Sequence, residues 1–314
     1  PTIENVQTGV EAFKKAETDY LIAIGGGSSM DTAKAIGIII NNPDFADVRS
    51  LEGVADTKNK AVPIFAVPTT AGTAAEVTIN YVITDAEKNR KMVCVDPHDI
   101  PVVAFIDSEM MSSMPKGLTA ATGMDALTHA IEAYVCKAAN PITDGLALLA
   151  IQMIQENILK AVKEHTPEAL DAMLAASTMA GMAFGNSDVA SVHSISEALG
   201  GFYDIPHGVA NAMMLAPVSR LSIKGAPEKY AKVAKALGVD ITGMTTTEAA
   251  NAGVDYIEKL SDQLEIPHFS ELEMVDPKDF KRLAHTAANA DETFDNPVLM
   301  KEEDFVALFE ELYR

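Results

Sequence analysis

Short apolar runs alternate with helical stretches in the first third of the chain. Residues 20–24, 64–67 and 102–106 form such runs, each of strand length and separated from the next by turn signals. Alternation of strands with helices is typical of βαβ units around a parallel sheet. We therefore predict an α/β fold for this part of the chain.

From about Pro115 onward the pattern becomes helical. Apolar residues are spaced three and four apart in segments such as residues 143–163, which places them on one helix face. The strand signals stop near residues 111–115, where a proline precedes the first long helical stretch. We therefore expect an α/β domain over residues 1–112 and an all-α domain over residues 113–314.

Length and charge narrow the class of protein. The 314 residues are enough for about two domains. The chain has 45 acidic and 24 basic residues and a formal charge of −21, which repels phosphate backbones and anionic lipid surfaces. Nucleic acid and membranes are therefore not expected partners.

The number of cysteines and the length of the apolar runs indicate the cellular location. Cys94 and Cys136 are too few for a disulfide framework or a CxxC metal signature, which fits the reducing cytoplasm. The longest apolar runs fall far short of the roughly 20 residues of a spanning helix, and no signal peptide precedes them. We expect a cytoplasmic location.

Three glycines follow the first predicted strand. Gly25, Gly26 and Gly27 lead through Ser28 into a helical stretch. Glycine lets the backbone approach a ligand closely, and the amides of a helix N-terminus favour an anionic pyrophosphate. Because Ser28 and Asp31 are three residues apart, we expect them to cap the helix reciprocally. The motif is shorter than a full dinucleotide fingerprint, so a tight turn without a ligand is the alternative.

A second polar loop follows the next predicted strand. It contains Thr69, Thr70, Gly72 and Thr73. Ligands of open α/β sheets bind outside the carboxyl ends of the strands, where both loops are expected to lie. Helix-capping and turn chemistry alone is again the alternative reading of these residues.

One acid and three histidines form a candidate metal site. Asp125 and His129 are four residues apart in a helical stretch and therefore share a helix face. His193 and His207 can join them only if the chain turns back, which we expect at Gly200 and Gly201. A carboxylate with three imidazoles suits a divalent transition metal with an open position for substrate. Helix-dipole and hydrogen-bonding roles are the alternatives, because the spacing alone is a loose pattern.

Longer strings resemble a known family. They are PTTAGTAAEVT from Pro68, GMDALTHAIE from Gly123, His193, and Pro206-His207-Gly208, in that order, with residues 291–297 similar to a late motif. Together they resemble the iron-containing alcohol dehydrogenase family. The resemblance implies an N-terminal Rossmann-like α/β domain for NAD or NADP, a C-terminal helical metal-binding domain, and catalysis between them.

The resemblance also implies which residues form the site. Metal ligands fall on Asp125, His129, His193 and His207, with iron(II) or zinc as the metal. Dinucleotide-binding positions fall on Gly25, Gly26, Gly27, Ser28, Thr69, Thr70, Gly72, Thr73 and Lys91. The implied activity is hydride transfer between NAD(P)(H) and a small alcohol or aldehyde of the lactaldehyde or propanediol kind, by a homo-oligomer such as a dimer.

Two departures from the family pattern bear on the activity. Where the family carries a second histidine, four residues after His193, this chain has Glu197. Glu197 is expected to relay protons, to join the metal as a ligand, or to hydrogen-bond within the site, and we count it with His207 as catalytic. The family also has about 70 residues before the position of Pro1, including an acidic residue that reads the ribose. Without them the domain is truncated, and we expect an exposed edge strand and weaker nucleotide binding.

Other functions fit parts of the pattern. A glycerol-dehydrogenase-type enzyme or a sugar-phosphate cyclase has the same architecture, although the string around Thr69 argues against both. A non-catalytic metal- or nucleotide-binding protein is the alternative outside enzymes, because of Glu197 and the shorter N-terminal domain.

Overall fold

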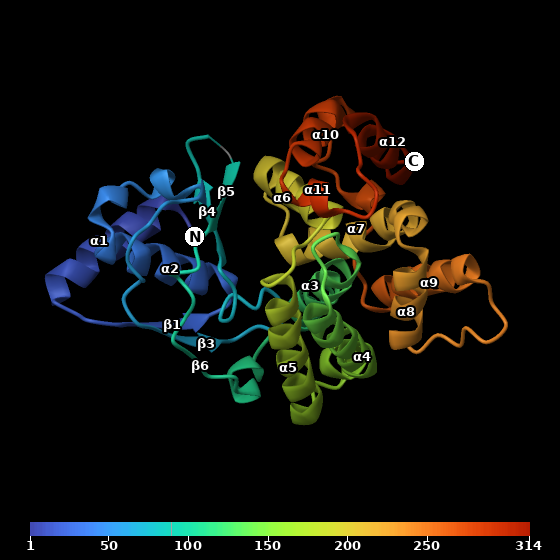
Figure 1. Ribbon diagram of the computed structural model, residues 1–314, viewed down its shortest axis with the longest axis horizontal. Helices are drawn as coiled ribbons and strands as arrows, with labels where there is room; N and C mark the ends of the chain where they lie inside the picture. Colours follow the sequence, from blue (N-terminus) through green and yellow to red (C-terminus); the bar gives the residue numbers. More distant parts are fainter. Residues whose placement is uncertain (89) are drawn as a thin grey trace.

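The computed structural model describes residues 1–88 and 90–314. Figure 1 shows two parts side by side, an α/β part from the first third of the chain and a larger helical part from the rest. The predicted fold class, an α/β region followed by helices, is confirmed. The chain passes from the first part to the second before α3, which begins at Lys116.

The first sheet is parallel and has the order β1-β3-β6. Its strands are β1 (Leu21–Gly25), β3 (Ile64–Pro68) and β6 (Val103–Ala104). The first two predicted runs are therefore strands, whereas only the start of the run 102–106 pairs with β3. Within the described residues β1 lies at the edge of this sheet, as expected. Ile22 and Ile24, on one face of β1, are 58% and 57% exposed, so that face of the sheet is uncovered there.

The second sheet is mixed and was not predicted. It has the order β2-β5-β4, with β2 (Gly53–Val54) parallel to β5 (Arg90–Val95) and β4 (Asn80–Asp85) antiparallel to it. The alternating residues Tyr81, Ile83, Met92 and Cys94 form its buried face. This alternation is the usual pattern of a half-buried antiparallel pair. Continuous apolar runs, which predict parallel strands, do not detect it.

Two helices cover the sheets of the α/β part. They are α1 (Ile3–Ala16) and α2 (Gly27–Asn41). The expected capping of α2 by Ser28 and Asp31 is wrong, because the helix begins at Gly27 and its N-cap is Gly26, which makes no side-chain cap. Asp31 instead accepts a hydrogen bond from the Val82 amide of β4, 3.2 Å away. Asp31 therefore holds the second sheet against α2.

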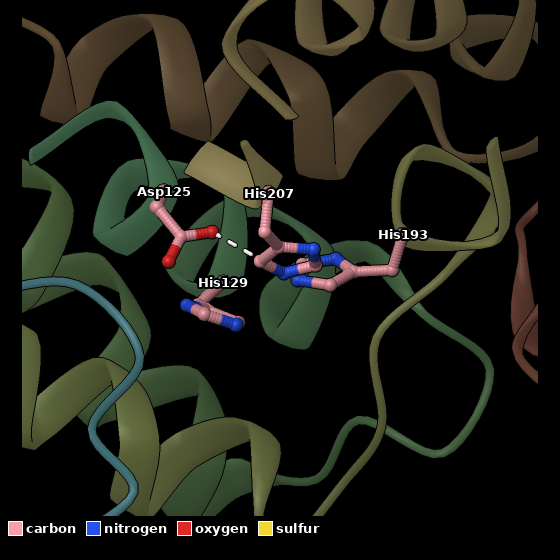
Figure 2. Close-up of side chains that lie close together, drawn as sticks. All are labelled: Asp125, His129, His193 and His207. Atoms are coloured by element: carbon pink, nitrogen blue, oxygen red, sulfur yellow. Dashed lines mark ion pairs between the residues drawn. The ribbon is translucent and has the colours of Figure 1, made fainter. Parts of the chain in front are cut away.

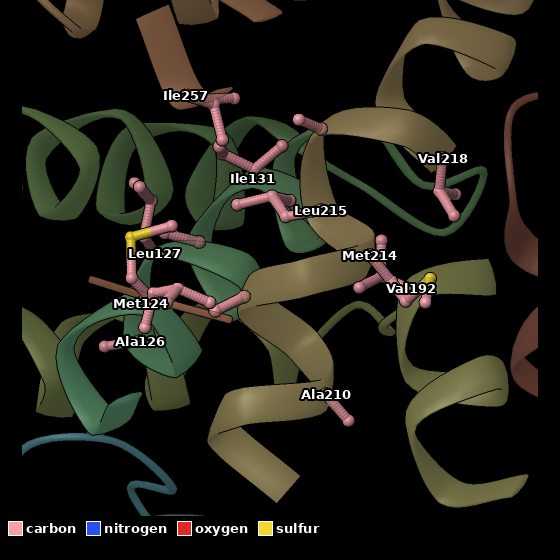
Figure 3. Packing of buried hydrophobic residues seen from close by; sticks show 14 of the residues in the cluster. Met124, Ala126, Leu127, Ile131, Val192, Ala210, Met214, Leu215, Val218 and Ile257 are labelled. Carbon is pink, nitrogen blue, oxygen red and sulfur yellow. The ribbon is translucent and has the colours of Figure 1, made fainter. Parts of the chain in front are cut away.

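The helical part has one large core. Its helices are α3 (Lys116–Val135), α4 (Pro141–Lys163), α5 (Pro167–Phe184), α6 (Ser191–Tyr203), α7 (His207–Ser222), α8 (Pro227–Ala236), α9 (Thr246–Gln263), α10 (Phe280–Ala288), α11 (Glu292–Asp295) and α12 (Glu302–Leu312). Figure 3 shows Leu127 and Ile131 of α3 packing near Leu215 of α7, all fully buried. This apolar contact fixes α7 against α3.

One described helix, α4, is long and apolar enough to cross a membrane by length and composition. A core helix passes the same test. Ile151, Ile154 and Ile158 of α4 are fully buried, and the helix packs against α3 and α5. The sequence pattern suggested no such helix, because polar residues interrupt its apolar runs.

Candidate functional site

The four predicted metal ligands come together in the helical part. Asp125 and His129 lie on α3, His193 lies in the first turn of α6, and His207 begins α7. One ligand atom from each lies within 4.8 Å of the others. Figure 2 shows the Asp125 carboxylate directed at the His207 ring, with Oδ1 3.6 Å from Nε2.

The chain reverses between the two later histidines at Asp204, not at the expected glycines. Gly200 and Gly201 lie inside α6, and Asp204 after it has a left-handed backbone with φ 55°. Pro206 then serves as the N-cap of α7. The reversal brings the His193 and His207 rings to a centroid distance of 5.3 Å.

A glycine permits α7 to approach α3. A Cβ added to Gly208 would lie 2.6 Å from the carbonyl oxygen of Ala121. Such an approach is too close for any side chain, so glycine is required where the two backbones meet. Gly208 thereby allows the adjacent His207 to reach Asp125.

Burial keeps the ligands in the form that binds a cation. It lowers the pKa of His129 to about 3 and the pKa values of His193 and His207 to about 4. Burial alone would raise the pKa of Asp125, but the three imidazoles and the Asn211 amide hold it below its usual value. At neutral pH the cluster is therefore one carboxylate with three neutral imidazoles, each with a free lone pair.

Neighbouring groups hold the imidazole rings. The His129 ring stacks on Phe184 at a centroid distance of 4.4 Å. Nδ1 of His193 lies 2.5 Å from the Glu132 carboxylate. Ser196 donates to the His207 carbonyl oxygen, so its hydroxyl oxygen is left to accept from His207 Nδ1 at 3.3 Å. At His193 and His207 these contacts leave Nε2 directed toward the cluster.

Sequence reasoning missed two residues of this site. The amide nitrogen of Asn211 lies 2.7 Å from Asp125 Oδ1, 3.1 Å from His207 Nε2 and 3.2 Å from His193 Nε2. Asn211 follows His207 by one helical turn, and Glu132 follows His129 by three residues on α3. Helical spacing from the predicted ligands was the signal that could have found both.

The residues present fit a divalent metal ion. Among the described residues, the buried Nδ1 of His129 has no hydrogen-bond partner, and His129 is held by ring stacking alone. A carboxylate and three imidazoles form a donor set that iron and zinc both accept. This arrangement can hold one ion with room for a further ligand.

The two predicted cofactor loops are adjacent. The Thr69 amide donates to the Gly25 carbonyl oxygen at 2.9 Å. A Cβ on Gly26 would lie 3.1 Å from Thr70, and one on Gly27 would lie 2.8 Å from Thr73. The exposed amides of α2 therefore begin beside the threonine hydroxyls, an arrangement suited to a phosphate group.

The loops also reach the metal cluster. A Cβ on Gly72 would lie 2.8 Å from Thr122, which precedes Asp125 by three residues on α3. Lys91 of β5 lies beside α6, because a Cβ added to Gly200 of α6 would be 3.1 Å from the Lys91 Nζ. The charge of Lys91 acts on both Glu197 and His207: it opposes the burial that raises the pKa of Glu197 and adds to the burial that lowers the pKa of His207. The predicted cofactor positions and the metal cluster thus border one region between the two parts.

Glu197 lies apart from the ligand cluster. It sits one turn after His193 on α6 and does not belong to the four-residue group. Burial, with Glu292 nearby, raises its pKa well above the usual value for a glutamate. Burial and the nearby Glu292 therefore favour the protonated form of this carboxyl.

Fold and site define a metal-dependent enzyme with an α/β part and a helical metal-binding part. Residues 1–108 match the family described as iron-containing alcohol dehydrogenase, and residues 119–313 match the Fe-containing alcohol dehydrogenase family, C-terminal. The chain therefore belongs to the iron-containing alcohol dehydrogenase family, and it is an enzyme of that family.

Individual relatives agree with this assignment. The chain is 50% identical to lactaldehyde reductase of Escherichia coli (strain K12) over 309 residues, which is 98% of this chain and 81% of the relative. The crystal structure of a 1,3-propanediol oxidoreductase superposes with a TM-score of 0.96 at 41% identity, covering 99% of this chain and 81% of that one. Sulfoacetaldehyde reductase from Bifidobacterium kashiwanohense in complex with NAD+ gives a TM-score of 0.88 at 29% identity, covering 100% and 81%.

Proposed function

We propose that this protein transfers a hydride between NAD(P)(H) and a small alcohol or aldehyde, with lactaldehyde and propanediols as the first candidates. The observation that carries the proposal is the convergence of Asp125, His129, His193 and His207 within 4.8 Å, bordered by the two cofactor loops. Relatives named for lactaldehyde, 1,3-propanediol and sulfoacetaldehyde support a short oxygenated substrate.

The helical part, taken as residues 113–314, is proposed to hold the metal through those four side chains. A bound iron(II) or zinc ion would supply a Lewis acid that polarises the substrate oxygen and favours the alkoxide near neutral pH. The protein's own contribution is orientation. Phe184, Glu132 and Ser196 fix the three rings, so the ligands are held in place before substrate binds.

The α/β part, taken as residues 1–112, is proposed to bind the dinucleotide. NAD or NADP would supply the hydride-carrying nicotinamide, and the protein would supply position and charge. We propose that amides at Gly26 and Gly27 and the hydroxyls of Thr69, Thr70 and Thr73 bind the pyrophosphate, because the two loops are adjacent. Lys91 lies beside Gly200 of α6 and is proposed to favour the negative charge of the cofactor.

Glu197 is proposed to relay the proton of the reaction. In aldehyde reduction a protonated carboxyl is needed, so a raised pKa keeps Glu197 competent at neutral pH and activity falls as pH rises through that pKa. In Glu197→Gln the side chain has no ionisable proton. We expect kcat to fall by about 10²-fold or more, as for the loss of a general acid. We also expect the decline of activity at alkaline pH to disappear. Steady-state rates across pH measure both effects.

An exposed glutamate provides the matched control. Glu156 lies on the outer face of α4, so Glu156→Gln is expected to keep the native rate and pH profile. An alkaline decline in Glu197→Gln identical to that of the native enzyme would rule out the relay.

The test of the whole proposal is a metal add-back assay. Metal-stripped protein is supplied with iron(II) or zinc, and NADH or NADPH oxidation is followed with lactaldehyde, glycolaldehyde and 3-hydroxypropanal. We expect turnover only with metal, and with one of these aldehydes preferred. Metal binding without any NADH or NADPH binding would count against the redox function and favour a metal-binding role alone.

A further inference from the structure

Glu132 links the two helices that carry the first three candidate ligands. It lies on α3, three residues after His129, and is 2% exposed. Its Oε2 accepts from the Ala190 amide at 3.0 Å and lies 2.5 Å from Nδ1 of His193, and its Oε1 accepts from the Val192 amide at 2.8 Å. All three recorded partners of the carboxylate lie at the start of α6.

Glu132 provides the cap that α6 lacks locally. The N-cap residue Ala190 has no side-chain acceptor, although the first amides of a helix normally receive one from Ser, Thr, Asp or Asn at this position. Here the acceptor comes from another helix. The start of α6, and His193 within its first turn, is therefore positioned relative to α3.

The same carboxylate determines which nitrogen of His193 carries the proton. Both oxygens of Glu132 already accept from backbone amides, so the group acts as an acceptor, and we assign the proton of His193 to Nδ1. The other side of the ring is consistent with this assignment. The Asn211 amide nitrogen lies 2.7 Å from Asp125 Oδ1 and 3.2 Å from His193 Nε2, where an acceptor lone pair on Nε2 suits it.

We propose that Glu132 is a positioning residue for the metal: it fixes His193 in the Nδ1-protonated tautomer with Nε2 toward Asp125. The proposal rests on the proposed metal site. The Glu132 carboxylate also makes Nε2 of His193 a more basic donor to a metal ion. Together with Asp125, it balances the charge of a divalent cation. If Glu132 only capped α6, neither a fixed tautomer of His193 nor an effect of Glu132 on metal affinity would be expected.

Glu132→Gln separates the two roles. Glutamine has one acceptor oxygen, so either its amide group faces Nδ1 of His193 and favours the other tautomer, or it faces the Val192 amide and leaves that donor unpaired. Tautomers are read from ring ¹⁵N shifts of histidine-labelled, metal-free protein, with His193 assigned from His193→Gln. Zinc affinity is measured by competition with a chromophoric chelator.

The expected result is about 10- to 100-fold weaker zinc binding, the range typical of lost outer-shell partners, with a change of His193 tautomer where the glutamine nitrogen faces Nδ1. The matched control is Thr166→Ala, which removes the side-chain hydrogen bond that caps α5 at the Ala169 amide, at the opposite end of α5 from Phe184. We expect this control to lower the melting temperature while leaving zinc affinity and the His193 tautomer unchanged.

Three outcomes would overturn the proposal. They are an Nε2-protonated His193 in the native protein, native zinc affinity in Glu132→Gln, and an equal loss of affinity in the Thr166→Ala control. The native spectrum decides the tautomer even if Glu132→Gln does not fold. A native protein that binds no zinc or iron would instead contradict the metal site itself.

Discussion

Replacing His207 by alanine is expected to abolish both metal retention and alcohol or aldehyde turnover. The variant loses one of four ligands and also the ring that lies 3.6 Å from the Asp125 carboxylate. Metal-ion catalysis contributes several kcal/mol, so loss of the ion should lower kcat/KM by about 10³-fold or more. Metal content by mass spectrometry and NADH-linked rates measure the two effects on the same sample.

An exposed histidine serves as the control for this prediction. His268 pairs with Asp262 at the surface, so His268→Ala is expected to retain both metal and activity. If His207→Ala kept full metal content and full activity, the assignment of the four ligands would be wrong.

Replacing Gly26 by valine is expected to weaken nucleotide binding and to leave the metal in place. The new Cβ would lie 3.1 Å from Thr70, and the valine methyl groups would cover the amides at the start of α2. Hydrogen bonds to charged groups contribute about 1.5–3 kcal/mol each, so the loss of one corresponds to about 10- to 100-fold weaker NADH binding. Fluorescence titration with NADH and parallel metal analysis measure the outcome.

Gly145 of α4 offers the matched control, because a Cβ there meets nothing within 4 Å. Gly145→Val is expected to leave NADH affinity unchanged. Native NADH affinity in Gly26→Val would place the dinucleotide elsewhere, while loss of metal in that variant would show damage beyond the loop.

The α/β part shows where sequence patterns were sufficient. Buried strands such as Ile64–Pro68 consist of continuous apolar residues, so the sequence pattern predicts their positions almost to the residue. The β4–β5 pair was missed because its alternating residues face the core on one side only, and its partner choice depends on long-range contacts. The predicted cap at Ser28 is wrong because β1 ends at Gly25 and α2 begins at Gly27, while Asp31 accepts a hydrogen bond from the Val82 amide of another strand.

By itself, the sequence determined the fold class, the family resemblance and the ligand pair Asp125 and His129, since helical spacing fixes which side chains share a face. Only the tertiary structure decided how His193 and His207 join them. The reversal at Asp204 and the close approach at Gly208 depend on packing between helices far apart in the chain. Glu132 and Asn211 lie at helical spacing from predicted ligands, but their roles come from hydrogen bonds between helices, which spacing alone does not give.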